Sequence, residues 1–142
     1  MNKFDKKIQR VKKILGSDEE PIVNKKTLKI YLEYLKKNIT LPCCLTGIED
    51  FLWEEFYVLG PGDRDEYEQM KKTRASYTDV FRLVNFQDYI SEDFGILVGI
   101  KRILGVNQRH FILGLEWLKC TEKNSKNYQL IDDYSVWFCN YR

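Results

Sequence analysis

The spacing of apolar residues changes along this chain, and the change limits the folds open to it. Up to about residue 40 the apolar residues recur every three or four positions, as on the buried face of a helix. From Tyr77 to Leu115 they tend to alternate with polar residues, as in strands that bury one face. Residues 127–142 return to helical spacing. This order of helices, strands and a closing helix indicates an α+β fold.

Two helices are expected in residues 1–38. The first ends at Gly16, because glycine commonly follows the last turn of a helix. The second begins at its N-cap, Asn24, and ends near Lys37. Its buried stripe is expected to consist of Leu28, Tyr31, Leu32 and Leu35.

The middle of the chain predicts a small antiparallel β-barrel of the SH3-like type, with about five strands. Strands are expected at 41–45, 80–86, 95–104 and 109–115, and a turn at 105–108 joins the last two. Residues 47–76 form a helical insertion, in which Gly60-Pro61-Gly62 breaks one helix and Asp63 with Glu66 caps the next. The chain is therefore expected to be a single domain, 1–142, with a helical N-terminal segment (1–38), a barrel (39–122) that carries the insertion 47–76, and a C-terminal helix (127–142).

Length and composition favour a folded cytoplasmic protein. The chain has 142 residues, of which 14% are aromatic, enough for a core of its own. It has no apolar run near the ~20 residues that cross a bilayer, so no membrane contact is expected. Residues 1–13 are too charged for a secretory signal. The four cysteines are irregularly spaced, and we expect reduced thiols.

The sequence contains no recognisable catalytic constellation, so we expect a protein that is not an enzyme. Its single histidine, His110, falls inside a predicted strand, and no glycine-rich phosphate loop is present. Zinc is not expected, because the adjacent Cys43 and Cys44 point to opposite faces of a strand. A hydrolase built on the carboxylates of Glu54 and Asp63 is the enzymatic alternative.

Charge is unevenly distributed along the chain. Residues 1–40 hold eleven Lys and Arg against five Asp and Glu, whereas residues 41–142 hold twelve against sixteen. Carboxylates crowd the segment 49–68, where like charges ~5 Å apart repel by about 3 kcal/mol at an effective dielectric of 20. A Ca²⁺ ion, which takes 6–8 oxygen ligands, relieves such repulsion. The candidate ligands in this segment are Glu49, Asp50, Glu54, Glu55, Asp63 and Asp65.

The basic N-terminal helices offer an alternative function. Eleven lysines and arginines surround them, and such a face binds phosphates weakly and in a salt-dependent way. The sequence lacks the pattern of aromatic residues and arginines that stacks bases, so a nucleic-acid site cannot be assigned to particular residues. The alternative is a module that binds a protein partner or RNA through the barrel and these helices.

The layout as a whole resembles a known family. The helical stretch 28–35 leads into Leu41-Pro42-Cys43-Cys44, and the strands lead to Leu115-Glu116-Trp117-Leu118 and an aromatic helix, 134–138. This arrangement, over 28–46 and 77–139, resembles the small calcium-binding protein family of cyanobacterial type. The resemblance implies an N-terminal helix, an SH3-like barrel and Ca²⁺ as the ligand. Asp132 and Asp133 occupy the stretch that corresponds to an acidic segment of that family.

Overall fold

The computed structural model describes residues 1–105 and 107–142, and it confirms the α+β fold. A five-stranded antiparallel sheet has the strand order β4-β3-β2-β1-β5. Its strands are β1 (Cys44–Gly47), β2 (Val80–Ser91), β3 (Gly95–Leu104), β4 (His110–Gly114) and β5 (Leu118–Cys120). The α-helices are α1 (Lys3–Leu15), α2 (Lys25–Asn38), α3 (Glu55–Val58), α4 (Arg64–Met70) and α5 (Lys126–Asn140), with short 3-10 helices η1 (Leu52–Glu54) and η2 (Leu115–Trp117).

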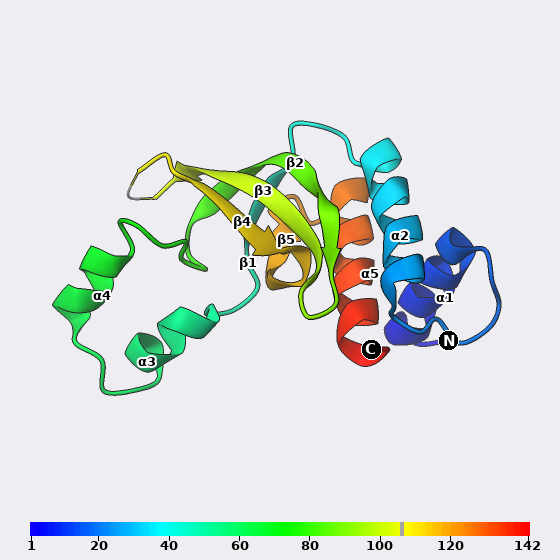
Figure 1. Ribbon diagram of the computed structural model, residues 1–142, viewed down its shortest axis with the longest axis horizontal. Coiled ribbons are helices and arrows are strands. Elements are labelled where there is room, and N and C mark those ends of the chain that lie inside the picture. The colour runs from blue at the N-terminus through cyan, green and yellow to red at the C-terminus, as the bar shows by residue number, and fades with distance from the viewer. Residues whose placement is uncertain (106) are drawn as a thin grey trace.

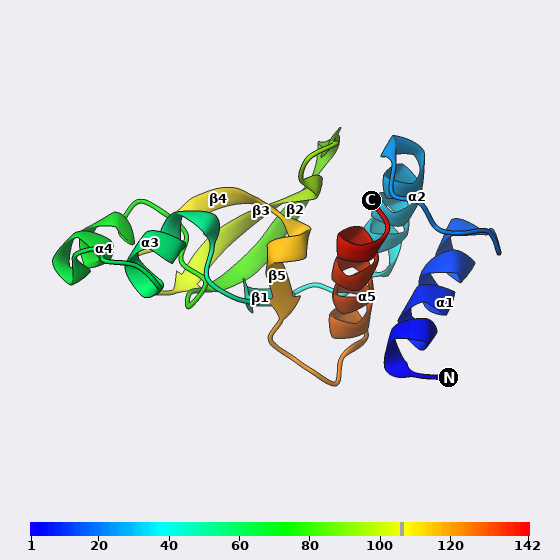
Figure 2. The same ribbon diagram turned by 90° about the horizontal axis from the view of Figure 1, so that it is seen from below.

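The helices form two groups on opposite sides of the sheet. Figure 1 and Figure 2 both show α1, α2 and α5 together on one side, and α3 and α4 at the far end of the molecule. The second group belongs to the insertion, which leaves the sheet after β1 and returns to it at β2. Because β1 and β2 are neighbours in the sheet, with Cys44 opposite Arg82, the insertion is a long excursion between two paired strands.

The ends of the first two helices follow the predicted capping chemistry. The Asn24 side chain accepts a hydrogen bond from the Thr27 N–H at 2.9 Å, so Asn24 is the N-cap of α2 as expected. Gly16 ends α1 with a φ of 73°, a left-handed conformation that glycine adopts without steric cost. The predicted cap Asp63 is also confirmed, since its carboxylate accepts from the Glu66 N–H at 3.0 Å at the start of α4.

Aromatic rings join α2 and α5 into the centre of the core. Tyr31, Tyr134 and Trp137 are fully buried, and the ring centroids of Tyr31 and Trp137 lie 5.5 Å apart. Such rings bury roughly 150–250 Å² each and dominate core energetics. The hydroxyls stay satisfied, because Tyr31 donates to the Leu130 carbonyl and Tyr134 accepts from the Ile96 N–H. The second of these bonds fixes α5 against β3.

The sheet is open, so the predicted SH3-like barrel is not confirmed. The strands β4 and β5 are the two edges of the sheet, and the described residues show no ladder between them. The third strand of the barrel prediction, 95–104, matches β3.

The bounds of three strands differ from the prediction, and β4 differs least, since it covers His110–Gly114 of the expected 109–115. The first was expected at 41–45 but β1 begins at Cys44, because Pro42 has no N–H to donate to a ladder. The second was expected to end at residue 86, whereas β2 continues to Ser91 with three shifts of register that break the alternation of its side chains. The predicted turn 105–108 contains Val106, which lies outside the described residues.

Candidate binding groove

Glu54, one of the proposed calcium ligands, is the buried centre of the insertion. Its side chain is fully buried, and both carboxylate oxygens accept hydrogen bonds. One oxygen accepts from the backbone N–H groups of Phe51 at 3.2 Å and Tyr77 at 2.8 Å. The other accepts from the hydroxyls of Tyr67 at 2.6 Å and Ser76 at 2.7 Å. Four donors from the start, middle and end of the insertion therefore meet on one carboxylate.

The two C-terminal candidates form ion pairs with the first helix. Asp133 is 1% exposed and receives the Arg10 guanidinium on both oxygens, at 2.7 and 2.8 Å. This bidentate contact raises the pKa of Arg10. Asp132 contacts Lys7 at 2.7 Å. The acidic pair thus joins α5 to the basic face of α1.

The other candidate ligands lie apart on the surface. Glu49 and Glu55 are exposed, Asp50 is half-buried after β1, and Asp65 is exposed in the first turn of α4. The remaining candidate, Asp63, caps that helix. Within the described stretches of the chain, no three His, Cys, Asp or Glu side chains gather where they could hold a metal ion. Calcium binding stays a prediction.

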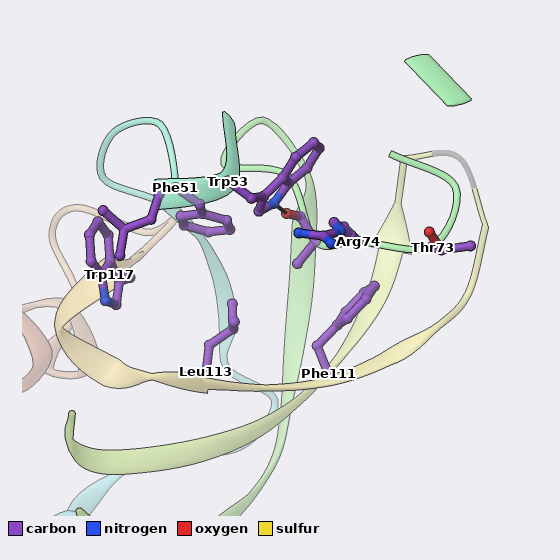
Figure 3. A pocket seen from close by; sticks show the side chains of 9 residues that line it. Phe51, Trp53, Thr73, Arg74, Phe111, Leu113 and Trp117 are labelled. Atoms are coloured by element: carbon purple, nitrogen blue, oxygen red, sulfur yellow. Dashed lines mark hydrogen bonds between the residues drawn. The ribbon is translucent and has the colours of Figure 1, made fainter. Parts of the chain in front are cut away.

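A different site, an apolar groove, lies between β4 and the insertion. It has a volume of about 430 Å³. Figure 3 shows Phe111 and Leu113 projecting from β4 on one side, with Phe51 and Trp53 of the insertion opposite and Trp117 at one end. Concave sites of this size with mostly apolar walls are typical of ligand-binding surfaces. We refer to it as the aromatic groove.

Buried polar contacts hold the insertion wall of the aromatic groove in place. Arg102 of β3 is fully buried and contacts the Asp79 carboxylate at 2.9 Å. The same guanidinium donates to the backbone carbonyl of Arg74 and to the side chain of Asn107. Nearby, the Trp53 indole N–H donates to the Ala75 carbonyl at 2.7 Å. These contacts fix residues 74–79 against β3, so the groove is formed before any ligand binds.

The edge of β4 presents free backbone groups along the aromatic groove. Arg102 donates its backbone N–H to the Arg109 carbonyl at 2.8 Å. Bonded and non-bonded pairs alternate along an antiparallel ladder, so the backbone groups of every second residue face away from β3. These outward-facing groups belong to His110 and Ile112. No other backbone group of residues 1–105 or 107–142 hydrogen-bonds to them.

The two edges of the sheet differ in how they are protected. Proteins guard edge strands by keeping them short or by placing Lys, Pro or bulges on them. The edge strand β5 has three residues with Lys119 in the middle. The strand β4 has five residues, His-Phe-Ile-Leu-Gly, with regular pairing and without a lysine or proline. Ile112, whose side chain lies on the face opposite to Phe111 and Leu113, is 60% exposed. The unprotected edge is therefore the one beside the groove.

A half-buried glutamate lies just after β4. Glu116 is in η2, next to Trp117 of the groove, and a Cβ on Gly114 would lie 2.6 Å from one of its oxygens. The other oxygen is buried and has no hydrogen-bond partner among the described residues. Burial raises the pKa of Glu116 to about 7, against smaller opposite effects of its own backbone N–H and of Arg142.

The wild-type protein is expected to lose stability relative to a Glu116→Gln variant as the pH rises from 4.5 to 7.5. The folded state holds the Glu116 proton up to about pH 7, whereas the unfolded chain releases it near the ordinary value of 4.5. Between these values the native state binds more protons, so stability falls with pH. Between 4.5 and about 7, at about 1.4 kcal/mol per pKa unit, the relative loss is on the order of 3 kcal/mol. Urea unfolding of both proteins across this range measures it, and two parallel stability profiles would contradict it.

The aromatic groove was not predicted from the sequence. The predicted sites consist of carboxylates and basic residues, whereas the groove is built from aromatic residues that any core also contains. One signal was available: Phe51 and Trp53 are aromatic residues of the predicted insertion 47–76, outside the predicted barrel strands. The strand order of the sheet, in which β4 is an edge strand, could not be predicted from the patterns of the individual strands.

The chain was compared with protein-family models, curated proteins and solved structures, and no match was found. Among the described helices, none combines the length and apolar character of a membrane span.

Proposed function

We propose that this chain is a protein-interaction module that binds an extended segment of a partner along β4. The observation that carries the proposal is the continuity of the apolar groove with an unprotected strand edge. A bound segment adds a strand to the sheet, and its backbone pairs with the outward groups of His110 and Ile112. Main-chain bonds of this kind supply affinity, while pockets for alternate side chains supply specificity.

The spacing of the groove side chains suits such a ligand. Phe111 and Leu113 are two residues apart on β4 and project to the same side, ~6.8 Å apart along the strand. Every second side chain of an added strand therefore faces the same apolar wall. Trp53 and Trp117 are half-buried there, and partly exposed tryptophans in pockets are typical hot spots of protein interfaces.

The SH3-like barrel belongs to this proposal. A barrel closes only when the two edges of its sheet meet, and β4 is one of those edges. A strand of the partner that is added at β4 extends the sheet at one of the two edges that have to meet. The barrel predicted from the sequence is then expected only when the partner is bound.

The proposal is tested with a library of random peptides displayed on phage, followed by synthesis of the selected sequences. Their dissociation constants are measured by calorimetry with the full chain. We expect Trp53→Ala to weaken binding by at least about 30-fold, since hot-spot aromatic residues contribute 2 kcal/mol or more. Ile112→Pro, which removes an outward N–H, is expected to weaken binding strongly, and Ile112→Val, which keeps it, less than threefold.

Modified peptides provide a control that leaves the protein unchanged. Each selected peptide is synthesised with N-methyl groups on alternate residues, in the two possible frames. One frame places the methyl groups towards β4 and is expected to abolish binding, whereas the other keeps it. Equal binding of both frames contradicts strand addition. Self-association of the chain through β4, seen by sedimentation and abolished by Ile112→Pro, would identify a second copy as the occupant instead.

The two ligands expected from the sequence stay proposals. Calcium binding is supported by the family resemblance and by the exposed carboxylates Glu49 and Glu55, and a CaCl₂ titration of the ¹⁵N NMR spectrum tests it. RNA binding is supported by the lysines of α1 and α2 that remain exposed. It predicts an affinity for polyanions that falls steeply with salt.

A further inference from the structure

One charged side chain lies in the apolar wall of the aromatic groove. Of the nine described residues that line it, Arg74 alone carries a formal charge. Figure 3 shows its side chain between Trp53 of the insertion and Phe111 of β4. The site is therefore an apolar surface with a cation in it.

Arg74 differs from the two arginines that form ion pairs within the described residues. Arg10 is paired with Asp133, and Arg102 with Asp79. The Arg74 guanidinium makes no ion pair and donates no side-chain hydrogen bond to any residue in the described ranges. Its charge is therefore not neutralised by a carboxylate of the described residues.

The local structure presents this guanidinium to a ligand. The backbone carbonyl of Arg74 is held by the buried Arg102, and the next residue, Ala75, accepts from Trp53. The Arg74 Cζ lies 5.8 Å from the Trp53 ring. A contact to the face of an indole leaves the in-plane N–H donors of the guanidinium free. The donors are thus positioned at the groove and are not used.

Carboxylates match this arrangement. The planar fork of an arginine pairs with a carboxylate through two parallel hydrogen bonds, and nearby apolar walls strengthen the attraction relative to water. We infer that the segment bound at β4 carries an aspartate or glutamate that pairs with Arg74, flanked at alternate positions by apolar residues that fill the aromatic groove. This inference rests on the proposed peptide-binding function and specifies the partner's chemistry.

The test uses a selected peptide and its Glu→Gln (or Asp→Asn) and Glu→Lys (or Asp→Lys) derivatives. We expect wild type to prefer the acidic peptide over its amide derivative by about tenfold, a difference of about 1.4 kcal/mol. Arg74→Gln is expected to remove this preference, and Arg74→Glu to reverse it towards the lysine peptide. Lys72→Gln, at an exposed cation two residues away that does not line the groove, is the matched control and is expected to change the preference less than twofold.

The outcomes separate the inference from the function on which it rests. Selected peptides without acidic residues that depend on Trp53 and on the β4 edge would overturn the inference and leave the function standing. A library that yields no binder at the groove would overturn both. An equal effect of Lys72→Gln and Arg74→Gln would attribute the preference to general surface charge and contradict a specific pair.

Discussion

Replacing Glu54 by alanine is expected to lower the free energy of unfolding by about 4 kcal/mol or more. The variant leaves two backbone N–H groups and two hydroxyls without their acceptor in a buried site. Each buried donor without a partner costs about 1–3 kcal/mol. Glu54→Gln is expected to cost about 2 kcal/mol, because the hydroxyls of Tyr67 and Ser76 can turn to accept from the new amide while the backbone donors keep their oxygen. Urea unfolding monitored by tryptophan fluorescence measures both.

Glu55→Ala is the matched control for this prediction. Glu55 is the next residue and is exposed, so its loss is expected to change stability by less than about 0.5 kcal/mol. A Glu54→Ala protein as stable as wild type would contradict the structural role of Glu54. Calcium that stabilises wild type but not this variant would instead make Glu54 a metal ligand.

Replacing Arg102 by methionine is expected to cost about 3–5 kcal/mol. Arg102 is fully buried, and its removal leaves the Asp79 carboxylate, which is 5% exposed, without a counter-charge. Breaking a buried pair by removing one partner has an effect of this size. The variant also loses the hydrogen bonds to the Arg74 carbonyl and to Asn107. Denaturant unfolding is the measurement.

Two further variants control this prediction. Arg82→Met removes an exposed arginine from β2, which has no ion pair in the described structure, and is expected to be nearly neutral. The double variant Arg102→Met/Asp79→Asn removes the orphaned charge and is expected to recover some of the loss. A single variant that unfolds like Arg82→Met would contradict the account of the pair.

Stability and binding are linked through the insertion. Glu54 and Arg102 hold the two stretches of chain, around Trp53 and around Arg74, that form one wall of the aromatic groove. Variants of either residue that remain folded are therefore expected to lose peptide affinity as well, although neither side chain lines the groove.

Local chemistry made the helices predictable. The caps Asn24 and Asp63 lie where the sequence places them, because their side chains accept hydrogen bonds from backbone N–H groups within a few positions. Gly16 ends α1 through its own backbone conformation. The C-terminal helix was also predicted, at 127–142, whereas α5 covers Lys126–Asn140. The alternation in 95–104 gave β3, which is buried along most of its length.

Contacts distant in the sequence were not predictable. The strand order depends on β1 pairing with β5, more than seventy positions away, and no local pattern encodes such a pair. In the sequence, Glu54 is one of several acids in an acidic segment. Its burial depends on hydrogen-bond donors, such as the Ser76 hydroxyl and the Tyr77 N–H, that the fold brings to it. The same applies to the partners of Arg102: the alternation of β3 places its side chain on the buried face, but the fold alone brings Asp79 and the Arg74 carbonyl to it.

Strand addition requires that a ligand backbone pairs with β4, and amide hydrogen exchange measures this directly. Exchange rates of the full chain are recorded by NMR with and without a saturating concentration of a selected peptide. Strand addition predicts that exchange of an outward amide, that of Ile112, slows at least tenfold, while the amide of Lys119 on the opposite edge is unchanged. An Ile112 amide that exchanges at the same rate in both samples, while the peptide is bound, would contradict it.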